Sequence, residues 1–289
     1  MGLNASLVLP LLFAALLHAG WNALIKSGGD KSLDTALMHS LSVVFALPAV
    51  LWFGLPPFAA WPFIGASWLI HTAYYAALAG AYRHGDLGLA YPVMRGSAPL
   101  LVALAGALLP GERLSGQAWL GVAVLSAGVL LVGLARTGQA AAGSGNHRKA
   151  LGFALANACI IACYTVVDGL GVRAAGNAFS YAAALFLLDG LPYLALVLWR
   201  AGPRRAQAVA YMRERAPLAL AGTAASLGSY AIALWAMLHA PVAVVAALRE
   251  TSVLFAALMG TFFLGERFGW GRAVGTALVV AGVVTLRFG

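Results

Sequence analysis

The sequence predicts an all-α polytopic membrane protein with ten transmembrane helices in two inverted five-helix repeats. Three observations predict this fold: the composition, a series of long apolar stretches and an internal repeat. The chain has 289 residues, of which 62% are hydrophobic and 9% are charged, whereas soluble domains carry about 25% charged residues. So few charged side chains cannot cover a protein surface in water, and we therefore expect the chain to lie in a membrane.

Ten stretches are long enough to be spans, since a membrane helix needs about 20 mostly apolar residues. We expect the first stretch to be a helix and not a cleaved signal, because no basic segment precedes the apolar run from Leu7 to Leu17. The predicted spans are residues 3–25, 33–53, 62–83, 87–109, 117–135, 150–172, 178–199, 216–238, 241–264 and 270–287.

The connections between these spans are mostly short, and none is long enough for a soluble domain. The longest are residues 136–149, rich in Gly, Ala and Ser, and residues 200–216, rich in Arg. The first of these divides the chain into equal numbers of spans. We therefore predict an N-terminal repeat over residues 1–136, a linker over 137–149 and a C-terminal repeat over 150–289.

The positions of the basic residues predict the orientation. The net charge of +9 comes mainly from short loops, where membrane topology selects for Lys and Arg, so we expect no nucleic-acid partner. In the loops and the adjoining span ends, 13 basic residues lie on the side of the loops that follow spans 1, 3, 5, 7 and 9, and only Arg113, Arg173 and Arg287 lie on the other side. With ten spans, this bias places both termini outside the cell.

The internal repeat appears when the sequence is shifted by 154 residues. Between residues 95–135 and 249–289, 13 of 41 positions are identical, including Arg95 with Arg249 and the Gly-Glu-Arg sequence at 111–113 with that at 265–267. Five spans are an odd number, so the two halves are expected to insert with opposite orientations. This is the architecture of many secondary transporters, which bind solutes near the membrane midplane between the repeats.

Polar residues inside the predicted spans indicate where such a site would lie, because buried polar groups in a membrane usually face a cavity. Their helical spacing places them on one face of spans 1, 3, 4, 6, 8 and 9. The candidate substrate-binding residues are His18, Trp21, Asn22, Tyr74, Tyr75, Tyr91, Arg95, Tyr164, Ser229, Tyr230, Arg249 and Glu250. The candidate ion-coupling residues are Asp168, Glu250 and His39.

Several of these residues also have a purely structural interpretation. Glu250 could pair with Arg249, or with Arg95 across the repeat, as a structural ion pair. His39, His71 and Asp189 could be hydrogen-bonded between helices. Glu112 and Glu266 are also interpreted as structural, each paired with the arginine that follows it. Spans 5 and 10 are expected to be packing helices with matched glycines, facing either lipid or a second subunit.

A cavity lined by aromatic rings, two arginines and a carboxylate suits an amphiphilic solute, since Arg holds carboxylates and aromatic faces hold rings or cations. The sequence has no GxxxxGK[ST] motif for ATP and no Ser/His/Asp set, HExxH or CxxC, so we predict a transporter without a cofactor or metal and not an enzyme. Two alternatives stay open: a permease for organic cations, sugar conjugates or polyamines, and a structural or receptor-like protein. The sequence does not decide between a monomer and a weak homodimer.

The motifs YPVMRG at 91–96 and LRETS at 248–252, with a Gly-Glu pair closing each helix, resemble the EamA-type branch of the drug/metabolite transporter superfamily. Within that branch, the aromatic lining is similar to that of the YddG-like aromatic amino-acid exporters. The resemblance implies a basket of helices around a central cavity, with spans 5 and 10 behind it. It also implies efflux of amino acids, aromatic ones above all, across the bacterial cytoplasmic (inner) membrane.

Overall fold

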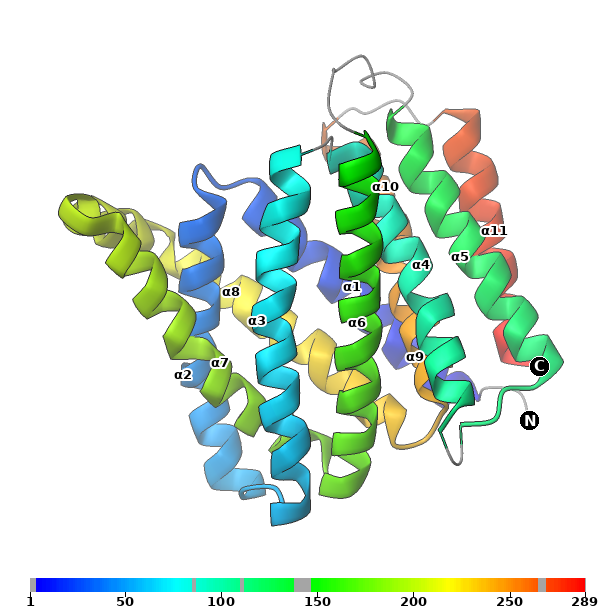
Figure 1. Ribbon diagram of the computed structural model, residues 1–289, viewed down its shortest axis with the longest axis horizontal. Helices are drawn as coiled ribbons and strands as arrows, with labels where there is room; N and C mark the ends of the chain where they lie inside the picture. The colour runs from blue at the N-terminus through cyan, green and yellow to red at the C-terminus, as the bar shows by residue number, and fades with distance from the viewer. Residues whose placement is uncertain (1–3, 85–86, 110–111, 138–146, 265–268, 289) are drawn as a thin grey trace.

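The structure, a computed structural model, describes residues 4–84, 87–109, 112–137, 147–264 and 269–288 (Figure 1). In this part of the chain every regular element is a helix, which confirms the predicted all-α class. The α-helices are α1 (Ala5–Lys26), α2 (Lys31–Phe53), α3 (Trp61–His84), α4 (Leu87–Ala107), α5 (Gly116–Thr137), α6 (His147–Ala175), α7 (Ala178–Ala201), α8 (Arg205–Met237), α9 (Val242–Arg249), α10 (Ser252–Leu264) and α11 (Trp270–Phe288). The 3₁₀ turns are η1 (Phe58–Ala60) and η2 (Gly202–Arg204).

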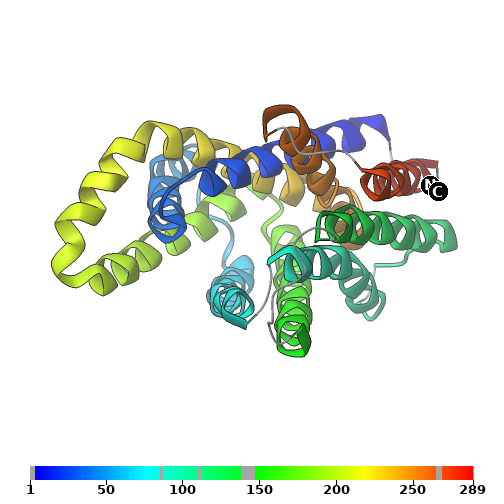
Figure 2. The same ribbon diagram turned by 90° about the horizontal axis from the view of Figure 1, so that it is seen from above.

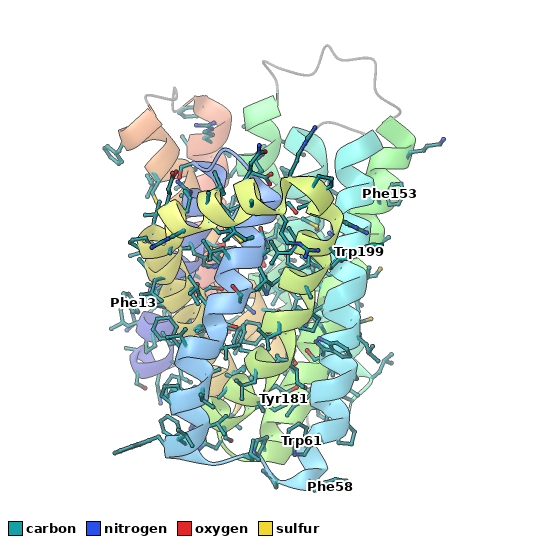
Figure 3. The ribbon with its side chains drawn as sticks, turned by 90° about the vertical axis from the view of Figure 1, so that its left-hand side faces the viewer. Phe13, Phe58, Trp61, Phe153, Tyr181 and Trp199 are labelled. Atoms are coloured by element: carbon teal, nitrogen blue, oxygen red, sulfur yellow. The ribbon has the colours of Figure 1, made fainter. Side chains whose placement is uncertain are left out.

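The outer surface of the bundle is apolar, as expected for a protein surrounded by lipid. Large side chains such as Trp52 and Phe58 are 84% and 88% exposed. Aromatic residues mark both ends of the bundle, with Phe58 and Trp61 at one end and Trp199 towards the other (Figure 3), where membrane proteins concentrate them. Seven stretches of the described chain are long and apolar enough to cross a membrane, which makes this a polytopic membrane protein.

The helix bounds agree closely with the predicted spans except in two places. The first is the segment 200–216, which the sequence predicts as a loop. Helix α8 begins at Arg205 and runs through most of this segment, so it has 33 residues. At 1.5 Å per residue such a helix is about 50 Å long, whereas the hydrocarbon core of a bilayer is about 30 Å thick. Its basic first turns therefore extend beyond the bundle next to the end of α7 (Figure 2).

The second difference is in the predicted span 241–264, which is not continuous. Helix α9 ends at Arg249, residues Glu250 and Thr251 form a turn, and α10 begins at Ser252. Transporter helices that are interrupted in this way place backbone and polar side chains at a binding site inside the membrane. The break therefore positions Arg249 and Glu250 in the interior of the protein.

The helices form two groups. Helices α1, α2, α7 and α8 pack against one another, and α3, α4, α5, α6 and α11 form the second group, with α9 in contact with both (Figures 1 and 2). Helix α1 begins and α11 ends at the same end of the bundle (Figure 1), as an even number of spans requires. The count of ten spans, the inverted relation of the halves and the domain limits stay predictions.

Helices α5 and α11 touch through their glycines. A Cβ atom at Gly128 would lie 2.6 Å from the Val279 backbone nitrogen, and one at Gly282 would lie 2.7 Å from the Leu125 nitrogen. Small residues permit this close approach of two helix backbones in a membrane. The glycines predicted to pack spans 5 and 10 therefore join these two helices to each other, and are not left open for a second subunit.

We expect Gly282→Ala to destabilise the protein by about 1–3 kcal/mol, the usual effect of overpacking a tight contact. The backbone of α5 cannot move away without disturbing the rest of the helix. Gly152→Ala in α6 is the matched control, because its Cβ would meet no atom within 4 Å and Ala is favoured over Gly in a helix by about 0.5–1 kcal/mol. Thermal unfolding in detergent measures both effects; equal shifts for the two variants would contradict the packing assigned to α5 and α11.

One end of the bundle is closed by a network around Glu112, which follows α4 and is buried. The carboxylate of Glu112 forms an ion pair with Arg173 of α6 and accepts a hydrogen bond of 2.9 Å from the Val242 nitrogen at the start of α9. Arg173 also donates to the carbonyls of Met237 and Ala240. The predicted pairing of Glu112 with its neighbour Arg113 is therefore wrong, because Arg113 is exposed while Glu112 points into the protein. Its counterpart Glu266 lies outside the described residues.

Candidate functional site

A cavity of about 150 Å³ lies between the two helix groups. It extends from the arginines in the middle of the bundle towards the end where α1 joins α2, reaching Ile25 and Met38. In the opposite direction the bundle closes in a continuous apolar core that contains Tyr181, Met237 and Val242. Figure 3 shows Tyr181 inside the helices near this closed end.

Ten of the predicted site residues line this cavity together. They are His18, Trp21, Asn22, His39, Tyr74, Arg95, Tyr164, Ser229, Tyr230 and Arg249. Two more, Glu250 and Asp168, line smaller voids beside it. The side chains of Tyr75 and Tyr91 lie outside the described part of the structure.

The α1 wall of the cavity follows directly from helical periodicity. His18, Trp21 and Ile25 are three and four residues apart, so their side chains stack along one face. The rings of His18 and Trp21 meet edge to face with their centroids 5.1 Å apart. Not every polar group on these faces is available to a ligand: Ser229 donates to the Ala14 carbonyl across the α8–α1 contact, and the Asn22 amide donates to the His18 carbonyl.

The two repeat-matched arginines have different surroundings. Arg95 of α4 forms a buried ion pair with Glu250, with 2.8 Å between Nε and Oε2. Its Nη2 lies 3.2 Å from His18 Nε2 and donates to Ser252. Because a guanidinium can only donate, His18 accepts through Nε2 and carries its proton on Nδ1. Of the two pairings open to Glu250 from the sequence, the structure has the one across the halves.

Arg249 has no such partner in the described part of the chain. No carboxylate there lies within 4.0 Å of it, and its buried Nε makes no hydrogen bond. Its guanidinium lies over the ring of Tyr230, with Cζ 5.4 Å from the ring centroid, in a cation–π contact. A half-buried arginine that lines a cavity can bind a carboxylate by two parallel hydrogen bonds.

Asp168 of α6 lies behind Tyr230, on the closed side of the cavity, and is 1% exposed. Its carboxylate accepts a hydrogen bond of 2.9 Å from the Tyr181 hydroxyl and a short one from the Tyr230 hydroxyl. A small void separates Asp168 from Arg249, and Tyr164 and Tyr230 line both this void and the main cavity. Tyr230 therefore contacts the candidate binding arginine with its ring and the buried carboxylate with its hydroxyl.

His39 and Asp189 form a pair across α2 and α7, with 2.8 Å between Nδ1 and Oδ2. Both residues also line the cavity wall. The sequence-based interpretation of the two as interhelical hydrogen-bonding residues therefore agrees with the structure. The pair also makes the cavity wall polar where α2 and α7 meet.

The structure adds three aromatic residues that the candidate list lacks. The ring of His71 stacks on Tyr164 with centroids 4.3 Å apart, and the ring of Phe186 meets Tyr230 edge to face at 5.4 Å. Trp68 completes this wall. A signal was present in the sequence, because Trp68 precedes His71, and Phe186 precedes Asp189, by three residues on the same helix face.

Apolar helices around a cavity that holds buried charges define a class of protein, the polytopic membrane proteins that handle small polar or amphiphilic molecules. Residues 148–288 match the EamA-like transporter family. The C-terminal part of the chain thus carries an EamA-like transporter domain of the drug/metabolite transporter superfamily, which implies a membrane transporter or permease of small metabolites.

The fold of the chain also occurs in solved structures. Among 28 matching chains, one crystal structure is similar over 98% of both chains, with a TM-score of 0.72 and 21% identity. At that identity the likeness concerns the fold alone. No curated protein matches the chain significantly.

Proposed function

We propose that the protein is a secondary transporter that exports aromatic amino acids, or similar amphiphilic metabolites, by alternating access between two inverted repeats. The observation that carries the proposal is Arg249, a half-buried cation without a carboxylate partner in the described part of the chain, placed at the floor of an aromatic-lined cavity. The carboxylate of the substrate binds Arg249, and the aromatic ring of the substrate lies among Trp21, Tyr164 and Trp68.

The charges around the cavity favour a carboxylate over an organic cation. Glu250 already neutralises Arg95, and Asp168 is enclosed by two tyrosine hydroxyls behind the cavity wall. An organic cation would therefore meet an uncompensated arginine on the cavity floor. Coulomb repulsion between like charges is strong where water is scarce.

The size of the cavity favours a small substrate. Pockets for drug-sized ligands usually enclose about 300–1,000 Å³, more than the 150 Å³ found here. If the basic loops face the cytoplasm, as the distribution of Lys and Arg predicts, the cavity extends towards the cytoplasm and the network around Glu112 closes the outer side. A substrate would then enter this conformer from inside the cell.

The test is counterflow into proteoliposomes that contain the purified protein and a high internal concentration of unlabelled L-phenylalanine. Labelled L-phenylalanine and L-tryptophan are expected to exchange. Phenethylamine, which lacks the carboxylate, and choline, an organic cation, are expected to fail as competitors. Exchange of the cations at rates equal to those of the amino acids would reject the proposal in favour of the alternative permease.

A further inference from the structure

We propose that Asp168 is the proton-carrying residue of this transporter and that Tyr230 couples its protonation to substrate binding at Arg249. The inference rests on the proposed function and adds the driving force to it. Among the carboxylates of the described spans, Asp168 combines deep burial with the lack of a cation within 4.0 Å. Intramembrane carboxyl groups of this kind mark proton relays in transporters.

The other two ion-coupling candidates are less suited to this role. Glu250 is held by Arg95 at 2.8 Å in a contact that joins α4 to the α9–α10 break, so its negative charge is compensated in place. His39 is hydrogen-bonded to Asp189, and this pair lies on the wall of the cavity away from Arg249. Neither residue contacts the ring that lies beneath the substrate site.

Four helices contribute groups that face Asp168. The carboxylate meets Tyr181 from α7 and Tyr230 from α8, and Ser67 and His71 approach it from α3. Arg249 of α9 faces it across the small void. The surroundings therefore consist of hydroxyl donors with charged groups at a distance, so that a carboxylate and a protonated carboxyl group can both be accommodated.

Tyr230 supplies the physical link between the two sites. Its ring lies 5.4 Å from Cζ of Arg249 and its hydroxyl donates to Asp168. A substrate carboxylate that draws the guanidinium towards itself changes the contact with this ring, and a displaced ring changes the hydrogen bond to Asp168. Coupling of this kind is reciprocal, because protonation of Asp168 must alter substrate affinity by the same factor.

The proton balance is simple. Asp168 takes one proton from the medium on the side where the substrate leaves, and releases that proton to the medium on the side where the next substrate binds. The substrate itself is chemically unchanged. One proton therefore moves against one substrate molecule.

The experiment measures accumulation of L-phenylalanine in proteoliposomes with an acidic lumen and the membrane potential clamped at zero. One-to-one exchange with a gradient of about one pH unit gives about tenfold accumulation at equilibrium, since one pH unit corresponds to a factor of ten. The wild type is expected to reach this value. Asp168→Asn is expected to show no accumulation while it still exchanges labelled for unlabelled substrate without a pH gradient.

Two further variants keep the test decisive if Asp168→Asn does not fold. Asp168→Glu keeps a carboxyl group and is expected to retain accumulation, and Tyr181→Phe removes one donor and is expected to displace the pH dependence of uptake. Glu214→Gln removes an exposed carboxylate at the basic end of α8 and serves as the control that leaves accumulation unchanged.

The outcomes separate the coupling proposal from the proposed function. Exchange without any accumulation by the wild type would overturn proton coupling and leave the transporter in place. Full accumulation by Asp168→Asn, or an unchanged pH dependence in both Asp168→Glu and Tyr181→Phe, would overturn the role of Asp168. Failure of the wild type to exchange any amino acid would instead reject the proposed function itself.

Discussion

Replacement of Arg249 by glutamine is expected to weaken the binding of L-phenylalanine by about 10- to 100-fold, because hydrogen bonds to charged groups contribute about 1.5–3 kcal/mol. The loss should appear in binding and not in stability. Since no carboxylate of the described chain pairs with Arg249, its removal leaves no buried charge without a partner. Competition against labelled substrate in detergent measures the affinity, and thermal unfolding checks that the variant is folded.

The substrate offers a matched control for this variant. If Arg249 binds the carboxylate, phenethylamine should bind Arg249→Gln no more weakly than the wild type, because this cation lacks the group that Arg249 contacts and is repelled by the arginine. Arg213→Gln, which changes an exposed arginine of α8, should leave both affinities unchanged. An equal loss for both ligands in Arg249→Gln would show that the arginine shapes the cavity and does not contact the carboxylate.

Glu250→Gln is expected to destabilise the protein by about 3–5 kcal/mol, the cost of breaking a buried ion pair by removing one charge. The buried Arg95 would then lose the carboxylate that lies 2.8 Å from its Nε. Unfolding in denaturant at fixed detergent concentration measures the effect.

The double variant Arg95→Met with Glu250→Met tests the same contact from the other direction. Replacement of a buried pair by apolar residues of similar size is often neutral or stabilising, so this variant should recover most of the stability lost in Glu250→Gln. If the double variant is as unstable as the single one, these residues contribute through contacts other than their ion pair.

Most of the helices could be predicted from the sequence, because membrane spans leave a strong signal of length and hydrophobicity. The start of α8 could not, since the segment 200–216, with five arginines, resembles a loop although Arg, Ala and Gln all favour helix. The break after Arg249 was equally hidden: no Gly or Pro marks it, and the sequence Arg-Glu-Thr-Ser continues an apolar helix without an evident interruption.

The sequence indicated which residues line the cavity, but not which of their side chains pair with one another. Helical spacing correctly placed the His18 stripe and Tyr164 on faces that the structure brings to one cavity. Spacing says nothing about contacts between distant helices, which is why Glu112 was assigned to Arg113 and why two partners stayed open for Glu250. Arg95 is neutralised by Glu250, whereas Arg249 has no carboxylate partner among the described residues; this distinction depends on those contacts, and it required the three-dimensional structure.

The glycine contact between α5 and α11 has a consequence for how the protein can move. Helices whose backbones touch cannot slide or rotate past each other without collision, so these two helices behave as a rigid strut on one side of the bundle. In the proposed transporter, rearrangement between open and closed states must therefore occur among the other helices. Spin labels on the strut would keep a constant separation through the transport cycle, and so provide the fixed frame in which motion of the other helices can be measured.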